Sequence, residues 1–301
     1  MEMRKMKKML FIMNPFAGQR RANRYLADIL TMFNRAGFDV TTYMTAGPGD
    51  GARMVREKAA EVDTVVCCGG DGTFNETITG LLQANVDIPV GYIPAGSTND
   101  FAASLRLPTN SLKAAQAIVE GSPKRYDLGQ FGERYFSYVA SFGAFTRASY
   151  STPQSVKNAL GHMAYLLEGI QELSQLKKTH VRLELDEGRV IEDDFLFGAV
   201  SNSTSVGGIL TLDPKQVDMS DGKFELLLVR APQDLGEVSE CLRALQTQKY
   251  NCRMVTFLSA SQVRITASPN MIWTLDGERG GGYEQVEVKM LHHALQLLQK
   301  D

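Results

Sequence analysis

The sequence is poor in several features by which large classes of protein are recognised. Only four of its 301 residues are cysteine, and Cys67 and Cys68 are adjacent in an apolar run. The cysteine spacing suits neither a metal cluster nor a disulfide framework, and it fits a reducing cytosol. No apolar run approaches the length of a membrane span. The net charge of −2 argues against a nucleic-acid binder, which would be strongly basic.

Two motifs of phosphate chemistry are also missing. The chain contains neither GxxxxGK[ST] nor the HRD catalytic loop, so both of those phosphoryl-transfer designs are excluded. A hydrophobic content of 44% and a charged content of 22% are those of an ordinary globular protein. The length is sufficient for two domains, each with its own core.

The chain is organised around Val65 to Glu76, which reads VVCCGGDGTFNE. Four apolar residues predict a buried strand of a parallel sheet, and helical spacing begins at Phe74. The glycine-rich turn between them aims N–H groups and a helix N-terminus at an anion, and its glycines leave room for a phosphate. Asp71 would repel a bare phosphate, so its carboxylate indicates Mg²⁺ between it and a nucleotide. For Gly-Asp-Gly alone, a plain tight turn is the alternative.

Two further loops accompany this turn. Asn14-Pro15 stands upstream, and the run PAGSTNDFA from Pro94 to Ala102 stands downstream. With these loops the sequence resembles the diacylglycerol kinase catalytic-domain family, and within it the soluble bacterial lipid kinases related to NAD kinases and 6-phosphofructokinases. The resemblance runs nearly end to end, whereas GGDGT alone would also admit a NAD kinase.

Alternating strands and helices predict that residues 1–124 form a nucleotide-binding α/β domain with a doubly wound parallel sheet, NAD-kinase-like by the resemblance. Ligands of such sheets lie beyond the carboxyl ends of the strands, where all three loops fall. We expect strands at 9–13, 38–43, 65–68 and 90–93, and helices at 19–36, 50–60 with Asp50 as N-cap, and 111–120.

Residues 125–301 contain many short strand patterns separated by turns, which predict a mainly antiparallel β-sandwich domain for the lipid substrate. An apolar stripe predicts a helix over 159–177, which is either core or the lining of an acyl-chain entrance. A C-terminal helix is predicted at about 292–301, and the resemblance implies that it packs back on the first domain.

The resemblance assigns an ATP site to the three loops and to one threonine after the second strand. Asp71 would position the catalytic Mg²⁺ through water. The residues expected to bind ATP are Asn14, Pro15, Ala17, Gly18, Thr45, Gly69, Gly70, Asp71, Gly72, Thr73, Asn75, Glu76 and Ser97.

Two acidic turns in the second half are further candidates. Related bacterial lipid kinases hold a structural Mg²⁺ at the turn matching Asp218, Asp221 and Lys223, where a lysine can offer only its carbonyl. Ser220 stands where relatives often carry a second acid, so a metal-free hairpin is the alternative. The resemblance makes Glu278 the base that takes a proton from the acceptor hydroxyl, with Asp276 nearby. From the residues alone, a solvated turn is the alternative.

The sequence is therefore interpreted as an ATP- and Mg²⁺-dependent lipid kinase of phospholipid biosynthesis, cytoplasmic and peripheral to the membrane. The expected acceptor is diacylglycerol, giving phosphatidic acid. The alternatives are another lipid such as phosphatidylglycerol or a sphingoid or isoprenoid alcohol, NAD, or a non-catalytic nucleotide- or lipid-binding protein. No nucleic-acid partner is expected, and a homodimer is compatible with the sequence but not required by it.

Overall fold

The protein is described from a computed structural model that covers residues 6–143, 177–186, 188–206, 210–250 and 252–300. The chain divides into two compact units, Met1–Tyr126 together with His293–Asp301, and Asp127–His292. Strands β5 (Ser122–Phe131) and β17 (Gln285–Gln299) carry the chain from one unit to the other. The helix predicted over 159–177 falls, except for its last residue, outside the described residues.

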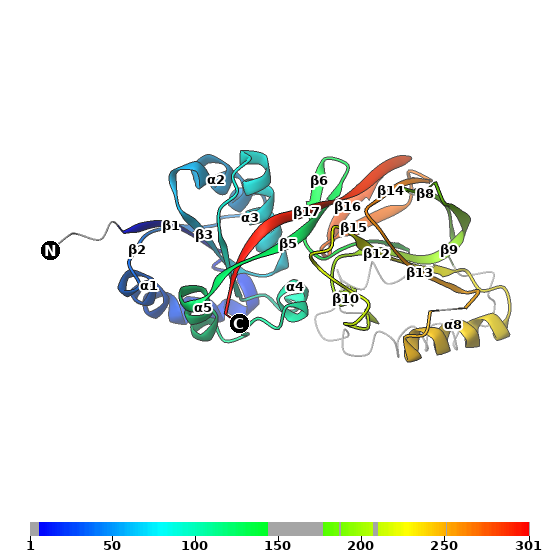
Figure 1. Cartoon of the computed structure of the whole chain (residues 1–301), viewed down its shortest axis with the longest axis horizontal. Helices are drawn as coiled ribbons and strands as arrows, with labels where there is room; N and C mark the ends of the chain where they lie inside the picture. Colours follow the sequence, from blue (N-terminus) through cyan, green and yellow to red (C-terminus); the bar gives the residue numbers. More distant parts are fainter. Residues whose placement is uncertain (1–5, 144–176, 187, 207–209, 251, 301) are drawn as a thin grey trace. The chain divides into compact units, whose positions relative to one another are not determined.

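The first unit is built on a parallel sheet in the order β2-β1-β3-β4 (Figure 1). Central strands β1 and β3 read as near-continuous apolar runs because helices cover both of their faces. The predicted fold class of this half is confirmed. The four strands are β1 (Lys7–Met13), β2 (Phe38–Met44), β3 (Thr64–Gly69) and β4 (Val90–Pro94).

Two pairs of helices cover this sheet. On one face, α1 (Leu26–Arg35) and α5 (Ser111–Glu120) pack around a core that includes Phe11 and Phe33. On the other face, α2 (Asp50–Lys58) and α3 (Asp71–Ala84) pack against each other (Figure 1). A Cβ on Gly80 of α3 would lie 2.6 Å from the Ala52 carbonyl oxygen, so the two helix backbones touch closely there.

Two helix starts differ from the prediction. Residues 17–25 form a 3₁₀ segment, η1 (Ala17–Tyr25), and the α-helix begins only at Leu26, where the buried apolar spacing starts. Helix α2 has Gly49, with φ of 81°, as its N-cap, and Asp50 is its first residue. A further short 3₁₀ turn, η2 (Ala59–Glu61), follows α2, and α4 (Asp100–Ser104) follows β4.

The second unit is antiparallel and β-rich, as predicted. Its strand order is β16-β15-β7-β9-β8-β14-β17, and β12 and β13 extend it from β9. The long β9 pairs with β8 along its first half and with β7 and β12 along its second half. Large aromatic side chains, Trp273 among them, fill the core on one side of the sheet. The further strands are β6 (Arg134–Phe136), β7 (Val139–Gly143), β8 (Thr179–Leu185), β9 (Val190–Ser201), β10 (Ser205–Val206), β11 (Leu210–Thr211), β12 (Phe224–Arg230), β13 (Val255–Ala260), β14 (Gln262–Ala267), β15 (Ile272–Leu275) and β16 (Glu278–Gly282).

The predicted C-terminal helix at 292–301 is wrong, because this segment continues strand β17 to Gln299. Within the first unit, Leu297 pairs in parallel with Val90 at the edge of β4. Leu295 and Leu297 are both buried, a spacing of two that suits a strand. The open edge of β4 offers backbone partners, and these outweigh the helix preference of a segment rich in Leu, Ala and Gln.

Helix α8 (Leu235–Thr247) was not predicted, although the sequence carries its start signal. The Asp234 side chain caps it by accepting the Glu237 N–H at 2.8 Å, and the Glu237 carboxylate accepts the Gln233 N–H at 2.7 Å. This reciprocal pair is a variant of the capping box, recognisable from the D-x-x-E spacing.

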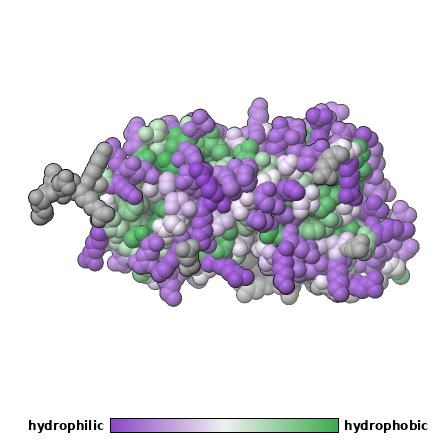
Figure 2. Space-filling view, in the orientation of Figure 1, coloured by the Kyte–Doolittle hydropathy of each residue, from purple (hydrophilic) through white to green (hydrophobic). Residues whose placement is uncertain are grey.

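Within the described ranges, no helix combines the length and apolarity needed to cross a bilayer. The face shown in Figure 2 is mostly hydrophilic, and its hydrophobic side chains form small groups.

Candidate functional site: the loops after the parallel strands

Three loops lie at the carboxyl ends of neighbouring strands in the first unit (Figure 1). We call them L1 (residues 14–18, after β1), L2 (69–73, after β3) and L3 (95–99, after β4). The Asn14 N–H donates to the Cys68 carbonyl at 2.9 Å, and the Ala95 N–H donates to the Gly69 carbonyl at 2.7 Å. The parallel register therefore brings together the three motifs that lie far apart in the sequence.

Glycines allow these loops to touch each other. A Cβ on Gly18, whose φ is +50°, would lie 1.8 Å from the Ala95 carbonyl oxygen. A Cβ on Gly96 would lie 2.6 Å from the Gly70 Cα, and a Cβ on Gly69 would collide with the Thr73 side chain at 2.5 Å. From the sequence, the L2 glycines were expected to clear space for a phosphate. At Gly69 and Gly70 the structure shows that they clear space for the protein itself.

Helix α3 starts directly from L2. Its N-cap is Gly70, which has no side chain to offer to the first N–H groups. A 14-residue helix that begins in this way presents the positive end of its dipole and several backbone donors. These features fit a phosphate at this position.

The carboxylate of Asp71 joins L2 to L3. It is 7% exposed, and it accepts the Asp100 N–H at 3.1 Å, the Phe101 N–H at 3.4 Å and the Thr98 hydroxyl at 3.4 Å. Because Asp100 and Phe101 open α4, this carboxylate serves as a cap for α4 although it belongs to the first turn of α3.

Asn99 fixes the shape of L3, a role that its sequence position did not indicate. It has φ of 54°, a conformation that Asn tolerates better than most residues. Its Oδ1 accepts the Gly96 N–H at 2.8 Å, and its Nδ2 donates to the Gly96 carbonyl at 2.9 Å. Ser97 stands exposed at the tip of the same loop.

L1 and the Thr45 position are held by contacts within the unit. The Asn14 Oδ1 accepts the Phe16 N–H at 2.9 Å, and its Nδ2 donates to the Thr73 hydroxyl at 3.3 Å. Thr45 is buried, and its N–H donates to the Met13 carbonyl at 2.9 Å. Asn14 thus lies where L1 and L2 meet, and Thr45 lies beside the end of β1, from which L1 starts.

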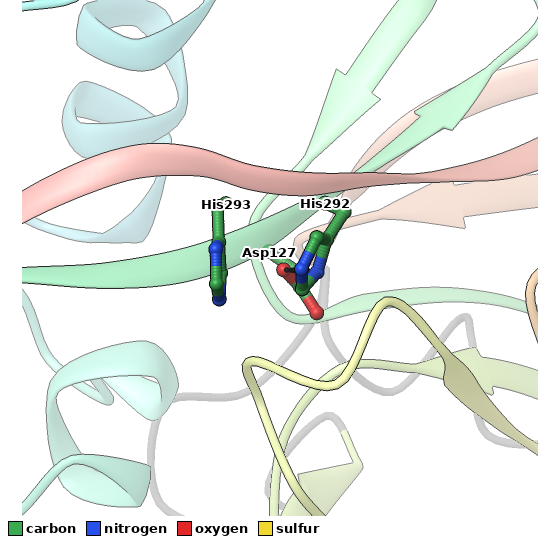
Figure 3. Close-up of side chains that lie close together, drawn as sticks. All are labelled: Asp127, His292 and His293. Atoms are coloured by element: carbon green, nitrogen blue, oxygen red, sulfur yellow. Dashed lines mark hydrogen bonds and ion pairs between the residues drawn. The ribbon is translucent and has the colours of Figure 1, made fainter.

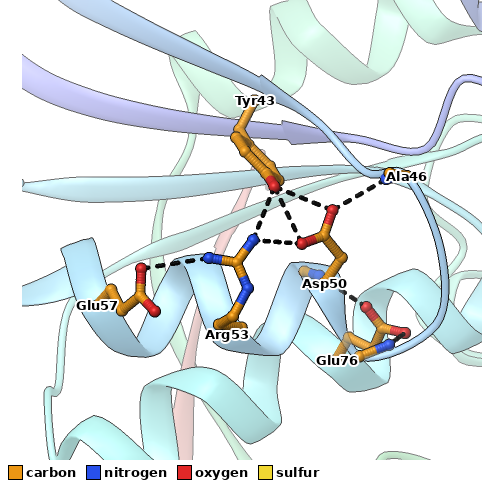
Figure 4. A network of polar contacts seen from close by, with 8 residues as sticks. Tyr43, Ala46, Asp50, Arg53, Glu57 and Glu76 are labelled. Atoms are coloured by element: carbon orange, nitrogen blue, oxygen red, sulfur yellow. Dashed lines mark hydrogen bonds and ion pairs between the residues drawn. The ribbon is translucent and has the colours of Figure 1, made fainter.

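Glu76 contacts the loop before α2. Its two carboxylate oxygens accept the Gly49 N–H at 2.6 Å and the Gly51 N–H at 2.9 Å (Figure 4). Asp50, beside these residues, accepts the Ala46 N–H and contacts Arg53, and these hydrogen bonds lower the pKa of its carboxyl group. Glu76 therefore holds the start of α2, the helix that follows Thr45.

The two cysteines before L2 are not nucleophile candidates. Cys67 and Cys68 are fully buried in β3. Burial raises the pKa of both thiols, that of Cys68 to about 12, so both remain protonated near neutral pH.

In the second unit, Asp276 and Gly277 form the two-residue turn of the β15–β16 hairpin. Their φ angles are 49° and 81°, and positive φ at both central residues is what a type I′ turn requires. The Asp276 carboxylate is 5% exposed and accepts the Ser137 N–H at 2.6 Å, the Tyr138 N–H at 3.0 Å and the Val139 N–H at 3.1 Å. Asp276 thus anchors the chain entering β7, while Glu278 is exposed at the start of β16.

The Asp218–Lys223 turn also lies in the second unit, and all three predicted ligand residues are exposed. Asp218 Oδ1 accepts the Ser220 N–H at 3.0 Å, and Asp221 Oδ1 accepts the Lys223 N–H at 2.9 Å. These bonds hold both carboxylates in the turn.

Buried Asp127 holds this turn in place through a hydrogen bond. It accepts the Gly222 N–H at 2.6 Å on one oxygen, and its other oxygen lies 3.0 Å from His292 Nδ1 (Figure 3). A Cβ on Gly222 would lie 3.3 Å from the same His292 nitrogen, so the imidazole packs directly on the turn. Asp127 and His292 therefore fix the position of the candidate cation turn.

Glu225, two residues after the turn, was not among the residues singled out from the sequence. It is 1% exposed on β12, and its Oε2 has no hydrogen-bond partner in the described structure. Burial, and after it the negative charge of Asp221, raises the pKa of its carboxyl group to about 8. The sequence did carry a signal for this residue, because Glu225 is an acid among apolar neighbours, with Phe224 before it and Leu226 to Val229 after it.

Comparison with known proteins gives the same assignment as the motifs. Residues 8–131 match the family model of the diacylglycerol kinase catalytic domain, and residues 139–299 match that of the YegS C-terminal NAD kinase beta sandwich-like domain. A diacylglycerol kinase of Bacillus subtilis is 32% identical over 298 residues, covering 98% of both chains. One from Staphylococcus saprophyticus is 32% identical over 278 residues, covering 91% of this chain and 90% of its own.

Solved structures agree in fold. A crystal structure of a diacylglycerol kinase from Bacillus anthracis has a TM-score of 0.74 at 22% identity and covers 99% of this chain and 98% of its own. Another crystal structure from that organism has a TM-score of 0.80 with the same coverage. The two folded units are thus those of a lipid-kinase-type enzyme. The chain belongs to the diacylglycerol kinase family, and the recognition made from GGDGT and its neighbouring loops is confirmed.

Proposed function

We propose that the chain is an ATP- and Mg²⁺-dependent kinase that phosphorylates diacylglycerol to phosphatidic acid. The observation that carries this proposal is the meeting of L1, L2 and L3 around the N-terminus of α3. Such a helix start supplies backbone donors and positive potential to a triphosphate without any basic side chain. The names of the relatives supply the acceptor, since each is a diacylglycerol kinase.

In the proposed reaction, the hydroxyl oxygen of the lipid forms a bond to the γ-phosphorus while the bond from that phosphorus to the leaving ADP oxygen breaks. Glu278, exposed at the start of β16, takes the proton of the hydroxyl as general base. The N–H groups at the start of α3 stabilise the negative charge that spreads over the transferring phosphoryl group. Asn14, Thr45 and Ser97 border the loops and are the polar side chains proposed for the nucleotide.

Asp71 is the residue proposed for the catalytic Mg²⁺, through water, and bound Mg²⁺ supplies charge neutralisation on the phosphates. The residues fit such an ion, because Asp71 is a carboxylate at the point where L2 and L3 meet. For the second cation, the support is the crowding of acids around the Asp218–Lys223 turn. The negative charges of Asp221 and Asp218 repel the carboxylate of buried Glu225. A cation held by the turn would reduce this repulsion.

The acceptor is tested with purified protein, labelled ATP and mixed micelles that each contain one acceptor. We expect label in phosphatidic acid with diacylglycerol, and a much slower transfer with phosphatidylglycerol or a sphingoid alcohol. Label in NADP in a parallel assay with NAD, or in another lipid alone, would refute the proposed acceptor. ATP binding without transfer to any acceptor would leave a non-catalytic nucleotide-binding protein and refute the kinase.

The second cation is tested by thermal unfolding in Mg²⁺ and in EDTA. We expect Mg²⁺ to raise the melting temperature of the wild type and of the Asp71→Asn variant, because the turn is intact in both. In the Asp221→Asn variant the rise should be lost. An equal rise in Asp221→Asn and wild type would show that this turn holds no stabilising cation.

The site of action is proposed from the substrate. A diacylglycerol acceptor is a membrane lipid, so the proposed enzyme works at a membrane surface from the cytoplasmic side. Co-sedimentation with vesicles that contain anionic lipid tests this, and protein that stays in the supernatant at all lipid concentrations would contradict it.

A further inference from the structure

A cavity of about 350 Å³ lies in the first unit. It is bordered by α5, by the segment that follows α4 and by the end of β17, all of which belong to this unit. None of the residues around it belongs to L1, L2 or L3. Its apolar lining comes from Leu107, Pro108, Ala114, Ala117, Ile118 and Leu298.

Cationic side chains stand at this apolar cavity. Lys300 is paired with Glu120, with 2.7 Å between Nζ and Oε2. Arg106 and Lys113 also border the cavity and are exposed, and neither forms an ion pair with any residue that the structure describes. Because the charges of Lys300 and Glu120 neutralise each other, two positive charges, those of Arg106 and Lys113, remain beside the apolar lining of the cavity.

The placement of Arg106 is costly for the backbone. The residue has φ of 54° and follows the C-cap of α4. Its N–H donates to the Ala103 carbonyl at 3.1 Å, and the Leu107 N–H donates to the Ala102 carbonyl at 2.9 Å. This is the Schellman helix end, whose left-handed position glycine normally fills. A side chain there strains the backbone, so the position favours glycine and yet carries a guanidinium at the cavity.

We propose that this cavity binds a small anionic amphiphile, that is, one phosphate or carboxylate group attached to a short apolar chain. Arg106 and Lys113 hold the anionic group, and the side chains of α5 and Leu298 cover the apolar chain. A volume near 350 Å³ equals about a dozen water volumes of ~30 Å³ each. An eight-carbon chain with one phosphate is therefore of suitable size.

The cavity is built against the back of L3. Tyr92 borders it, is 2% exposed, and its hydroxyl donates to Asn99 Oδ1 at 3.4 Å. Asn99 is the residue that fixes Gly96 in L3. The site is nevertheless separate from the proposed nucleotide site, so its binding is measured without ATP or any lipid acceptor.

The test is binding of octyl phosphate below its aggregation concentration, followed by calorimetry and by thermal unfolding. Inorganic phosphate and octan-1-ol serve as the two halves of the ligand, and octanoate serves as the carboxylate counterpart. We expect saturable binding of octyl phosphate with one site, and binding at least tenfold weaker for either half. Octan-1-ol binding as tightly as octyl phosphate would overturn the proposal, because the cations would then be irrelevant.

Two variants locate the ligand. Arg106→Gly keeps the left-handed backbone at lower cost, and Lys113→Gln removes the second cation at an exposed position. We expect each to weaken octyl phosphate binding about tenfold or more, equivalent to the loss of one charge-assisted contact. Arg106→Gly should also melt at a higher temperature than the wild type, which separates lost binding from lost folding.

The control is Arg35→Gln, which removes an exposed cation on α1 of the same unit. It should bind octyl phosphate as the wild type does. Since both cavity variants leave L1, L2 and L3 intact, a ligand held by those loops would bind them unchanged. Binding within twofold of wild type in the Arg106→Gly/Lys113→Gln double variant would therefore refute the cavity site.

Discussion

The same dipeptide, Asp-Gly, follows a buried strand in each unit and does a different job in each. Asp71-Gly72 comes after β3 and opens a 14-residue helix. Asp276-Gly277 comes after β15 and turns the chain straight into β16. The residues after the dipeptide decide between helix and hairpin, since helical spacing continues after Gly72 and strand residues pair back after Gly277.

The carboxylates differ accordingly. Asp71 accepts two N–H groups from the start of α4, at 3.1 and 3.4 Å, and the hydroxyl of Thr98 in L3. Asp276 accepts successive N–H groups of residues 137–139 at 2.6 to 3.1 Å. These contacts make Asp276 a structural anchor, whereas Asp71 is the residue that we propose for the catalytic Mg²⁺. The acid beside the Asp276 anchor that we propose as the general base is Glu278.

The largest expected effect is that of Glu278→Gln. Loss of the general base should lower kcat by about 10²- to 10⁴-fold. The free energy of unfolding should stay within about 0.5 kcal/mol, because surface substitutions rarely change it more. Steady-state assays and denaturant unfolding measure both quantities, with Glu284→Gln, another exposed acid of the same unit, as control. Activity above a tenth of wild type would remove Glu278 from the role of base.

Asp71→Asn should come second. The amide cannot supply the negative charge proposed for Mg²⁺, so we expect kcat to fall about 10²- to 10³-fold. It also weakens the cap on α4, which should lower the free energy of unfolding by about 1–2 kcal/mol. Asp63→Asn is the control, since Asp63 accepts one backbone N–H at 2.8 Å at an exposed position. If extra Mg²⁺ fails to change the residual rate and the activity equals that of the control, Asp71 is not the residue for the catalytic Mg²⁺ and does not differ from Asp276 in role.

Asp276→Asn should lower the free energy of unfolding more, and kcat less, than Asp71→Asn does. Its amide nitrogen would face backbone N–H donors, so we expect the free energy of unfolding to fall by about 2–4 kcal/mol. The kcat per folded molecule should fall far less than in Glu278→Gln. Asp213→Asn is the matched control, because the Asp213 carboxylate accepts the Lys215 N–H at 3.0 Å within its own turn. A stable but inactive Asp276→Asn would show that Asp276 belongs to the chemistry after all.

Much of this contrast could be predicted from local pattern. The apolar run at 65–68 and the glycine turn after it predicted β3 and α3 correctly, because strand, turn and helix are all specified within about twenty residues. The β15–β16 hairpin was not predicted, because the segment ERGGG after Asp-Gly carries no strand pattern. The partners of the carboxylates could not be predicted. That Asp71 caps α4, and that Glu76 caps α2, depends on contacts across 25 to 30 positions of sequence.

The wrong predictions have the same origin. The last strand looked helical because its composition favours a helix, and its pairing with β5 and with Val90 of β4 makes it a strand. The helix α8 had a readable start at Asp234, but no helix was predicted from it. Glu225 is recognisable in the sequence as an acid in an apolar strand, but its burial without a partner for Oε2 among the described residues is known only from the structure. Local sequence therefore specified the loops, and tertiary pairing specified which groups their side chains contact.

The smallest effect concerns exposed carboxylates, the opposite extreme from Asp71 and Asp276. On the surface of the second unit, Glu192 and Asp194 lie 3.2 and 3.1 Å from the two ring nitrogens of His180. Hydrogen bonds to Glu192, and then to Asp194, raise the pKa of this histidine above 6.5. The folded protein thus holds this proton more tightly than the unfolded chain. The resulting stabilisation is fully present below pH 6.5 and is lost as the pH rises through the folded pKa.

We expect an NMR titration of the His180 ring to give a pKa above 6.5 in the wild type, and a value nearer 6.5 in Glu192→Gln. Added salt should reduce the difference, because solvent and ions screen exposed pairs. The Asp276 anchor, by contrast, should be insensitive to the same salt, since it is buried. Equal salt sensitivity of the two would mean that burial does not separate the anchoring carboxylate from the surface pairs, and the assignment of Asp276 as a buried anchor would lose its physical basis.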